Sequence, residues 1–346
     1  MFKATIIGHF GFGYSYSDGQ TVKTKNLADC LCQEYGIENI NMQDTHGGIK
    51  SLLKAPLMLL KAFKTSENII ILPAHRGIKI YAPIISFYKC FFKRKKVHYV
   101  VVGGWIHNLV KNNQFLKKSL ARFDYIYTET SILKKRLFEV GLKNVTVLPN
   151  FKNINIINEK NMNYPCNAPY KLCTFSRVMK EKGIEDAIMA VSEINRKYDR
   201  KVFELDIYGP IDENEHDWFT SLKNRFPNYV KYCGVIPPEK SVDIVKNYFA
   251  LLFPTLFYTE GIPGTILDAY CSGVPVIASR WESYSDVVEE NITGIGYEFK
   301  DINDLIRVLD EVSIFPEKIL NLKKNCLEYA IHYSPNEVIK ILVKNM

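Results

Sequence analysis

Two acidic residues, eight positions apart, stand in the part of the sequence whose residue types are best suited to chemistry. Glu260 and Asp268 lie within the stretch 251–279, LLFPTLFYTEGIPGTILDAYCSGVPVIAS. Gly261 and Gly264 follow the first acid, and glycine lets a ligand approach the backbone closely. Because ionised carboxylates accept hydrogen bonds from hydroxyl groups, the segment predicts a site for a ligand rich in hydroxyls.

The hydrophobic pattern around these acids predicts a strand, a loop, a helix and a second strand. Residues 250–253 and 274–278 are apolar runs of the length of buried strands, and Gly273 ends a helix-like segment between them. The N-terminus of a helix presents unpaired N–H groups and a positive dipole end, which suit a phosphate. Glu260 in the loop suits sugar hydroxyls, and Asp268, about two turns into the helix, suits a neighbouring diol. A nucleoside diphosphate sugar has all of these groups.

The same segment resembles the nucleotide-sugar site of the family 4 retaining glycosyltransferases, which have the GT-B fold. The family pattern has two acids, usually both Glu, separated by seven residues and followed by small-x-Gly-x-Pro-Val-Ile. Here the second acid is Asp268, which shortens the reach by one methylene and keeps the pair of acceptors. The alternative is a plain α/β crossover loop with solvated acids, and the combined Glu-Gly-Ile-Pro-Gly and Gly-Val-Pro-Val-Ile spacing favours the nucleotide-sugar site.

A basic turn follows the predicted strand 171–176. Arg177 offers a bidentate fork and Lys182 a point charge, and together they can neutralise a diphosphate. The resembling family has Arg and Lys at this spacing, followed by a glycine, here Gly183. Considered alone, this segment is better interpreted as a solvated basic turn, but its occurrence with the Glu260 segment favours a diphosphate site.

The resemblance implies roles for further positions of the second half. In the family, the residues that follow the strand predicted at 230–233 contact the nucleobase, partly through backbone groups, which implies this role for Val235. Catalytic roles are expected for Arg177, Lys182 and Glu260. Donor-binding roles are expected for Gly209, Val235, Gly261, Gly264, Thr265 and Asp268. Retention is implied, with the leaving phosphate oxygen assisting deprotonation of the acceptor, so no protein nucleophile is expected.

The length of 346 residues and the alternation of strand and helix patterns predict an α/β protein of two Rossmann-like domains with doubly wound parallel sheets. The first domain is expected over residues 1–152, with strands near 4–9, 37–41, 68–72, 97–102, 125–128 and 145–148. An Asn-rich linker over 153–169 precedes a nucleotide-sugar domain over 170–333. The GT-B resemblance implies that the last helix, 334–346, crosses back to the first domain, and Ser334-Pro335-Asn336-Glu337 predicts a capping box at its start.

Ligands of such sheets bind beyond the carboxyl ends of the strands, which places several first-domain segments near a site. The glycine-rich loop 10–19 lacks the third glycine of a dinucleotide fingerprint, but the resemblance places its end, Gly19 and Gln20, at the cleft on the acceptor side. A structural turn with an N-cap remains an equal alternative. Trp105 could stack on a sugar or pack in the core, and His107 or His75 could move a proton or simply pack.

Composition excludes several classes of protein. No run of 18 apolar residues predicts a membrane span, and the N-terminus lacks the pattern of a signal peptide. The eight cysteines contain no zinc spacing, which is typical of reduced thiols in the cytoplasm. Because Asp-x-Asp is absent and the seven histidines show no metal-ligand spacing, we expect no metal site and no cofactor beyond the nucleotide sugar.

The net charge of +8 suits an anionic partner. Residues 87–96, FYKCFFKRKK, combine aromatic and basic side chains and predict association with an anionic membrane surface. The apolar and Lys-containing segment 51–64 is better interpreted as a helix packed on the sheet. Nucleic acid is not an expected partner, because the basic residues look dispersed along the sequence.

The resemblance implies transfer of a sugar from a nucleoside diphosphate sugar, UDP-sugar foremost, to a hydroxyl of a glycan or lipid-linked acceptor. It implies a place in capsule or other surface polysaccharide biosynthesis, in the cytoplasm or at the inner face of the membrane. Two alternatives share the fold class. One is a nucleotide-sugar epimerase, and the other is a non-catalytic subunit that binds sugar or nucleotide for a partner enzyme.

Overall fold

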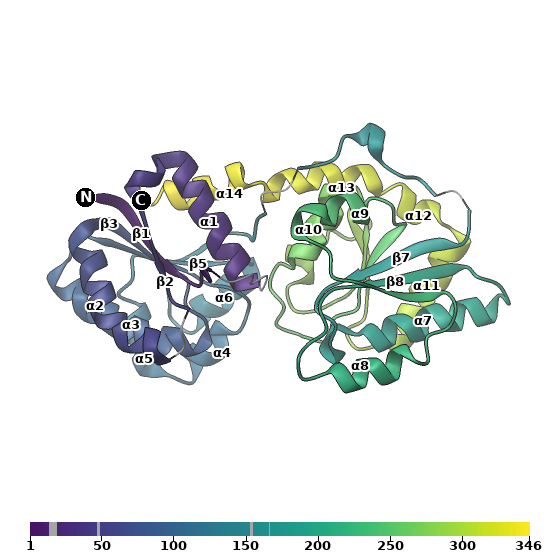
Figure 1. The fold of residues 1–346 in the computed structure, drawn as a ribbon, viewed down its shortest axis with the longest axis horizontal. Helices are drawn as coiled ribbons and strands as arrows, with labels where there is room; N and C mark the ends of the chain where they lie inside the picture. The colour runs from purple at the N-terminus through teal and green to yellow at the C-terminus, as the bar shows by residue number, and fades with distance from the viewer. Residues whose placement is uncertain (14–18, 47–48, 153–154, 166) are drawn as a thin grey trace. The chain divides into compact units, whose positions relative to one another are not determined.

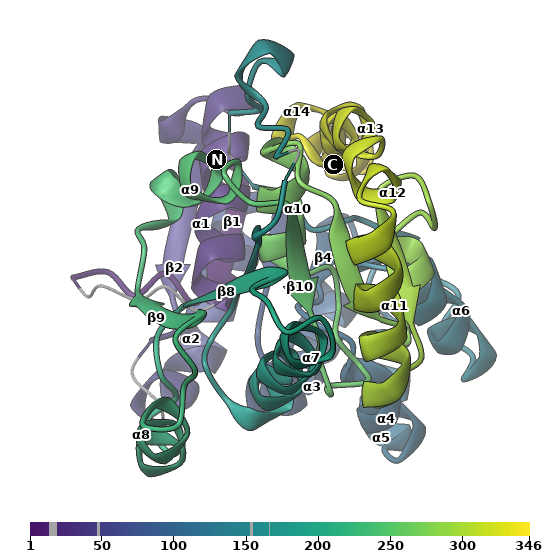
Figure 2. The same ribbon diagram turned by 90° about the vertical axis from the view of Figure 1, so that its right-hand side faces the viewer.

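The computed structural model describes residues 1–13, 19–46, 49–152, 155–165 and 167–346, and it divides into two compact units. The first unit contains Met1–Asn153 and Tyr333–Met346, and the second contains Ile154–His332 (Figures 1 and 2). Residues 14–18 of the predicted glycine-rich loop, and 153–154 and 166 of the predicted linker, lie outside the described residues. None of the described helices combines the length and the apolar character needed to cross a membrane.

The first unit is built on a six-stranded parallel sheet of order β2-β1-β3-β4-β5-β6. Its strands are β1 (Phe2–Gly8), β2 (Ile40–Asp44), β3 (Ser66–Ile71), β4 (Lys96–Val100), β5 (Tyr125–Thr128) and β6 (Val145–Val147). The connecting helices are α1 (Gly19–Tyr35), α2 (Ile49–Thr65), α3 (His75–Phe91), α4 (Ile106–Lys111), α5 (Gln114–Leu120) and α6 (Ser131–Glu139). The predicted strand 37–41 is wrong by three residues, because Gly36 turns the chain at φ 86° into a short 3₁₀ helix, η1 (Ile37–Asn39).

Two apolar clusters cover the two faces of this sheet. One joins strand residues to the inner sides of α2, α3, α5 and α6. The other joins Ala4, Ile6 and Ile70 to α1 and to the C-terminal helix α14 (Pro335–Val343), which contributes Val338, Ile339 and Leu342. The predicted return of the C-terminal helix to the first unit is therefore confirmed. The capping box predicted at Ser334 does not form, since the Ser334 side chain makes no capping hydrogen bond.

The second unit repeats the architecture around a parallel sheet of order β12-β11-β10-β7-β8-β9. Its strands are β7 (Tyr170–Phe175), β8 (Phe203–Tyr208), β9 (Val230–Gly234), β10 (Ala250–Phe253), β11 (Val276–Ser279) and β12 (Gly294–Tyr297). Its α-helices are α7 (Ile184–Lys197), α8 (His216–Lys223), α9 (Ser241–Val245), α10 (Gly264–Cys271), α11 (Ile302–Ile314), α12 (Glu317–Leu320) and α13 (Lys323–Ala330). The predicted class, two doubly wound parallel α/β sheets, is confirmed.

The segment expected to link the domains packs on the second unit where the structure describes it. The Ile157 amide donates a hydrogen bond of 3.0 Å to the Cys271 carbonyl at the end of α10. A short 3₁₀ helix, η2 (Glu159–Asn161), follows. The Asn-rich composition thus corresponds to irregular chain held against one unit, and the chain division falls at Asn153.

Candidate active site

Loops at the carboxyl ends of β7 and β10 meet through a glycine that no other residue can replace without strain. Gly183 has φ 68°, and a Cβ atom there would lie 1.8 Å from the Pro254 carbonyl oxygen. The two loops are also joined by a hydrogen bond of 2.8 Å from the Leu256 amide to the Glu181 carbonyl. The glycine that follows the basic turn therefore lets this turn contact the loop that carries Glu260.

Lys182 and Glu260 form an ion pair at this junction. Lys182 ends a 3₁₀ helix, η3 (Lys180–Lys182), and its Nζ lies 2.6 Å from Glu260 Oε1. Both side chains are largely shielded from solvent, and Nζ also lies 5.9 Å from the centroid of the Phe253 ring. The two residues are separated by 78 positions in the sequence, so the fold brings together two of the three predicted catalytic side chains.

Arg177, the third predicted catalytic residue, lies in the loop after β7 and is half exposed. Its NH1 lies 3.4 Å from Asp212 Oδ2. The pKa of Asp212 is lowered, first by the Asn214 backbone amide and also by Arg177. Because this single long contact leaves the rest of the guanidinium fork exposed, Arg177 can bind an added anion.

The N-terminus of α10 opens directly after the Glu260 loop. Pro263 is the N-cap, and no side chain caps the first turn, which begins at Gly264. The Thr265 hydroxyl is buried and has no hydrogen-bond partner. Asp268, in the second turn, is 2 % exposed. A helix end with uncapped N–H groups and an unsatisfied hydroxyl fits the phosphate-binding role predicted for Gly264 and Thr265.

Gly209 and Val235, also predicted to bind the donor, lie at the ends of neighbouring strands, and Gly261 lies next to Glu260 in the loop between β10 and α10. Gly209 follows β8, and its φ of 132° allows a close approach, because a Cβ would lie 1.8 Å from the Ser176 carbonyl oxygen. The Gly209 amide also donates a hydrogen bond of 2.9 Å to the Gly234 carbonyl at the end of β9. Val235 comes next and is exposed. Trp281, after β11, is buried, and its indole N–H has no partner.

Residues 169–313 match the sequence profile of the family described as glycosyl transferases group 1. The matched residues make up most of the second unit, which is therefore similar to a group 1 glycosyltransferase domain. The matched segment contains Arg177, Lys182, Glu260 and the α10 N-terminus, so the resemblance predicted from those residues is confirmed.

Two curated relatives match a larger part of the chain than the family profile does. An uncharacterized glycosyltransferase of Methanocaldococcus jannaschii is 25 % identical over 229 residues, which are 60 % of this chain and 57 % of the relative. The N,N′-diacetylbacillosaminyl-diphospho-undecaprenol α-1,3-N-acetylgalactosaminyltransferase of Campylobacter jejuni is 25 % identical over 227 residues, 65 % of this chain and 51 % of the relative. The chain thus spans about half the length of the curated relatives it matches.

The fold has solved counterparts. The Anabaena protein HepE, in a crystal structure with UDP and glucose, superposes with a TM-score of 0.74 over 99 % of both chains at 13 % identity. Similarity at this low identity shows the fold alone, and it confirms the predicted GT-B architecture.

The predicted acceptor-side residues belong to the first unit. Gln20 is in the first turn of α1, after Gly19, and donates a hydrogen bond of 2.9 Å to the Leu72 carbonyl after β3. The Trp105 indole donates to Val102 O at 2.7 Å, and its ring contacts the His75 ring edge-on. Trp105 also packs on the core, as the packing alternative predicted. His107 is half-buried in α4, and its Nδ1 is buried without a partner.

Sequence analysis missed a polar cluster at the same strand ends. His9, after β1, lies 2.7 Å from the Thr21 hydroxyl through Nδ1 and 2.9 Å from His46 Nδ1 through Nε2. Asp44, at the end of β2, accepts hydrogen bonds from the amides of Phe10, Phe12 and His46. These bonds lower the pKa of Asp44 although its partial burial opposes them. His9 ends the predicted strand 4–9, and Asp44 and His46 come shortly after the predicted strand 37–41, which was the available signal.

A buried ion pair joins α1 to residues at the carboxyl ends of the strands of the first sheet. Lys23 Nζ lies 2.5 Å from Glu129 Oε1, directly after β5, and 3.1 Å from the Val101 carbonyl oxygen. The two side chains are 3 % and 5 % exposed. The pair fixes the helix that carries Gly19 and Gln20 against the strand ends.

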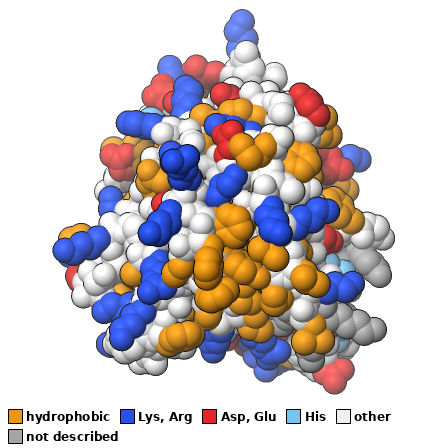
Figure 3. Space-filling view, turned by 90° about the vertical axis from the view of Figure 1, so that its left-hand side faces the viewer, with side chains coloured by type: hydrophobic (Ala, Val, Ile, Leu, Met, Phe, Trp, Pro, Cys, Tyr) orange, Lys and Arg blue, Asp and Glu red, His pale blue; other side chains and the backbone are white. Residues whose placement is uncertain are grey.

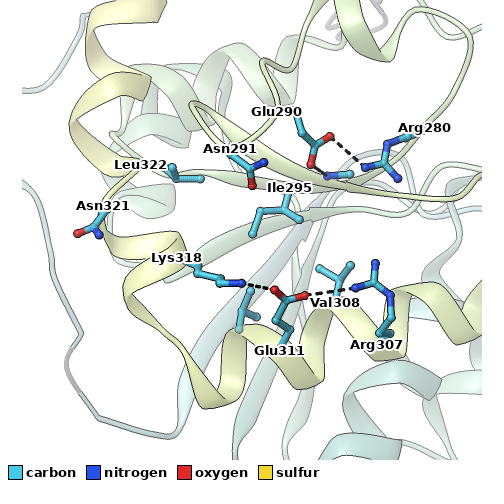
Figure 4. Close-up of a pocket in the computed structure, with 12 residues that line it drawn as sticks. Arg280, Glu290, Asn291, Ile295, Arg307, Val308, Glu311, Lys318, Asn321 and Leu322 are labelled. Carbon is cyan, nitrogen blue, oxygen red and sulfur yellow. Dashed lines mark hydrogen bonds and ion pairs between the residues drawn. The ribbon is translucent and has the colours of Figure 1, made fainter.

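A cavity of about 420 Å³ in the second unit lies apart from the predicted site residues, none of which lines it. It opens between β12 and the helices α11 and α12 (Figure 4). Its charged side chains are satisfied by one another: Arg280 pairs with Glu290, and Glu311 pairs with Arg307 and Lys318. Among the described residues, no group of three or more His, Cys, Asp or Glu side chains has an arrangement that could hold a metal ion.

Proposed function

We propose that this protein transfers a sugar from a nucleoside diphosphate sugar, most specifically a UDP-sugar, to a hydroxyl group with retention of anomeric configuration. The observation that carries the proposal is the Lys182–Glu260 pair, located in the segment that matches the group 1 glycosyltransferases, beside the uncapped N-terminus of α10. Cations, helix N–H groups and a carboxylate together match a diphosphate joined to a sugar. The choice of UDP follows the UDP-bound HepE structures.

Each residue has a distinct role in this proposal. Arg177 and Lys182 stabilise the negative charge that develops on the leaving diphosphate, assisted by the N–H groups of Gly264 and Thr265. Glu260 orients the sugar hydroxyls, and Asp268 holds the ribose diol. Gly209, Gly261 and Val235 form the backbone and apolar surface against which the donor lies. The charge of the diphosphate is met by these protein groups, and the proposal requires no metal ion and no cofactor.

The acceptor in this proposal is a glycan or a lipid-linked sugar, held by the first unit near Gly19, Gln20, Trp105 and His107. The support is that the Campylobacter relative is named for an undecaprenol-diphosphate acceptor. We place the reaction in surface polysaccharide biosynthesis, such as capsule assembly, in the cytoplasm and at the inner face of the membrane.

The experiment is a thermal-shift screen of UDP, GDP, ADP and their common sugar conjugates against the wild type and Arg177→Ala. A ligand at 100 times its Kd stabilises the protein by about 2.7 kcal/mol. We expect stabilisation by UDP and by one UDP-sugar, and a smaller shift in Arg177→Ala. Donor turnover with added acceptor lipid extract then distinguishes transfer from epimerisation, which needs no acceptor. If no nucleotide stabilises the protein, the transferase proposal is wrong and the non-catalytic subunit becomes the better interpretation.

A further inference from the structure

Helix α3 has two apolar faces, although its position on the sheet accounts for only one of them. Its inner side chains, among them Ile78 and Tyr81, are buried in the core of the first unit. Phe87 and Phe91, four positions apart on another side of the helix, are 59 % and 69 % exposed. A helix on the surface of a soluble domain normally has one apolar stripe. The exposed phenylalanines therefore point to a surface with a partner.

Helix α2 repeats this arrangement. Ala55 and Leu59 are buried against the sheet, as expected for a helix packed on it. Leu53 and Leu57, also four positions apart, are 77 % and 76 % exposed. The interpretation of segment 51–64 as a core-packed helix is thus right for one face and leaves the exposed leucines unexplained.

The exposed apolar residues belong to helices that are packed against each other. The Tyr88 hydroxyl of α3 donates a hydrogen bond of 3.2 Å to the Pro56 carbonyl of α2. Helices α3 and α5 are also in contact, and α5 adds the exposed Phe115. We call the surface formed by Leu53, Leu57, Ile80, Phe87, Phe91 and Phe115 the apolar–basic face. Figure 3, viewed from the side where α2 lies in Figure 1, shows apolar side chains gathered together with Lys and Arg around them.

The charge of the segment that builds this face is strongly positive. Residues 49–123 contain fifteen Lys or Arg and a single acid, Glu67, whose carboxylate pairs with Lys3. Since the whole chain has a net charge of +8, the rest of the chain is net negative. The basic residues are therefore concentrated rather than dispersed. Exposed cations on the same helices or directly after α3 include Lys54, Lys61, Lys79, Lys93 and Arg94.

We propose that the apolar–basic face docks on an anionic lipid bilayer, with its leucine and phenylalanine side chains inserted at the headgroup level. The exposed apolar side chains match the acyl boundary of such a bilayer, and the cations around them match its anionic headgroups. A nucleic acid would satisfy the cations but would leave the exposed leucines of α2 in water. The inference extends the membrane location in the proposed function, from the segment 87–96 to a three-helix face, and it does not depend on the chemistry of the second unit.

The test measures binding of the full chain to phosphatidylcholine vesicles with and without about 30 % phosphatidylglycerol. The variant Phe87→Glu/Phe91→Glu is compared with Met189→Glu/Ile314→Glu, which makes the same change of charge at apolar residues of the second unit that are 55 % and 53 % exposed. We expect the wild type and the control to bind the anionic vesicles. We expect the Phe87/Phe91 variant to lose roughly tenfold or more in partition coefficient.

Two further measurements keep the result interpretable. The variant Leu53→Ser/Leu57→Ser, which keeps the charge, should also bind the anionic vesicles more weakly. UDP-induced thermal stabilisation should be the same in all variants, so a failure of the docking surface is distinguishable from a failure of the donor site. Equal vesicle binding by the Phe87/Phe91 variant and its control overturns the inference. Tighter binding to a single-stranded oligonucleotide than to the vesicles, at equal salt, also overturns it and assigns the face to nucleic acid.

Discussion

The ammonium of Lys182 lies 2.6 Å from the carboxylate of Glu260, so two residues with different proposed tasks neutralise each other's charge. The pair is supported by the glycine contact between Gly183 and Pro254, which fixes the spacing of the two loops. A bound diphosphate would offer Lys182 a second anion. In the proposed mechanism, this short contact would couple binding of the diphosphate by Lys182 to positioning of the sugar by Glu260.

This coupling predicts opposite effects of two substitutions on nucleotide affinity. Glu260→Gln releases Lys182 from its partner, so UDP should bind at least as tightly as to the wild type while donor turnover falls by roughly 10²–10³-fold. Lys182→Met should weaken UDP binding by about tenfold or more and lower turnover as well. Calorimetric titration with UDP and steady-state turnover of the UDP-sugar check both values. Weaker UDP binding by Glu260→Gln would contradict the idea that Glu260 and the diphosphate compete for Lys182.

The contact at Gly183 predicts that Gly183→Ala lowers the free energy of unfolding more than most Gly→Ala substitutions do. Gly183→Ala places a methyl group 1.8 Å from the Pro254 carbonyl oxygen, so the loops must separate. We expect a loss of stability well above the roughly 1–2 kcal/mol for a left-handed residue alone, together with weaker UDP binding. Gly234→Ala is the matched control, because Gly234 has φ 79° and no atom within 4 Å of its Cβ position. Equal thermal midpoints for the two variants would show that the loops tolerate the separation.

The buried pair Lys23–Glu129 predicts that a single substitution destabilises the first unit much more than the double substitution does. Glu129→Leu alone leaves the Lys23 ammonium in the core without its carboxylate partner and should cost about 3–5 kcal/mol, and Lys23→Met alone should also destabilise the first unit. The double variant Lys23→Met/Glu129→Leu should recover most of this loss, because both charges are gone. Urea unfolding of the first unit measures the effect, and Lys246→Met, at an exposed pair, serves as the control. Additive losses in the double variant would contradict the reasoning.

His98 predicts an acid-sensitive first unit. Burial lowers the pKa of His98 from 6.5 to about 3, and its ring nitrogens contact the Tyr127 hydroxyl and Asn68 Oδ1. Between these pH values the unfolded chain binds a proton that the folded chain does not, so stability falls as the pH decreases from 6.5 towards 3. The cost at pH 5 is on the order of 2 kcal/mol.

The check is the pH dependence of the thermal midpoint in His98→Gln, which should be flatter than that of the wild type over this window. The control His332→Gln changes an exposed histidine and should keep the wild-type slope. An unchanged slope in His98→Gln would rule out His98 as the source of the acid sensitivity.

The fold was predictable because its signals are local. Short apolar runs separated by helical patterns fix the order of strands, and parallel sheets then place Glu260 and the Arg177 turn at the same edge. The pairing of Lys182 with Glu260 was not predictable, since it depends on loop conformations set by Gly183 and Pro254. Asp212 as the partner of Arg177 was missed for the same reason.

Surface chemistry was predictable only in part. The composition of residues 87–96 indicated an interfacial segment, because five cations beside aromatics cannot all be buried. The exposed side of α2 was not predictable from its sequence, because Leu53, Leu57 and Leu59 are the same residue type. Only the packing of α2 on the sheet shows that Leu59 is buried and that Leu53 and Leu57 are exposed. A hydrophobic pattern indicates that a helix has apolar residues, but it does not show which of them are covered by the sheet and which are exposed.

Helix α14 supplies Val338, Ile339 and Leu342 to the core around β1 and α1. During synthesis the first unit, although it begins first, is therefore completed after the second unit. The ribosome finishes the whole second unit, Ile154–His332, before it makes the last helix of the first. At about 5–20 residues per second, the first unit waits roughly 10–40 s with an open apolar surface after its sixth strand has been made. Nascent chains of this protein therefore have a period of exposure during which a chaperone, or the early folding of the second unit, decides the yield.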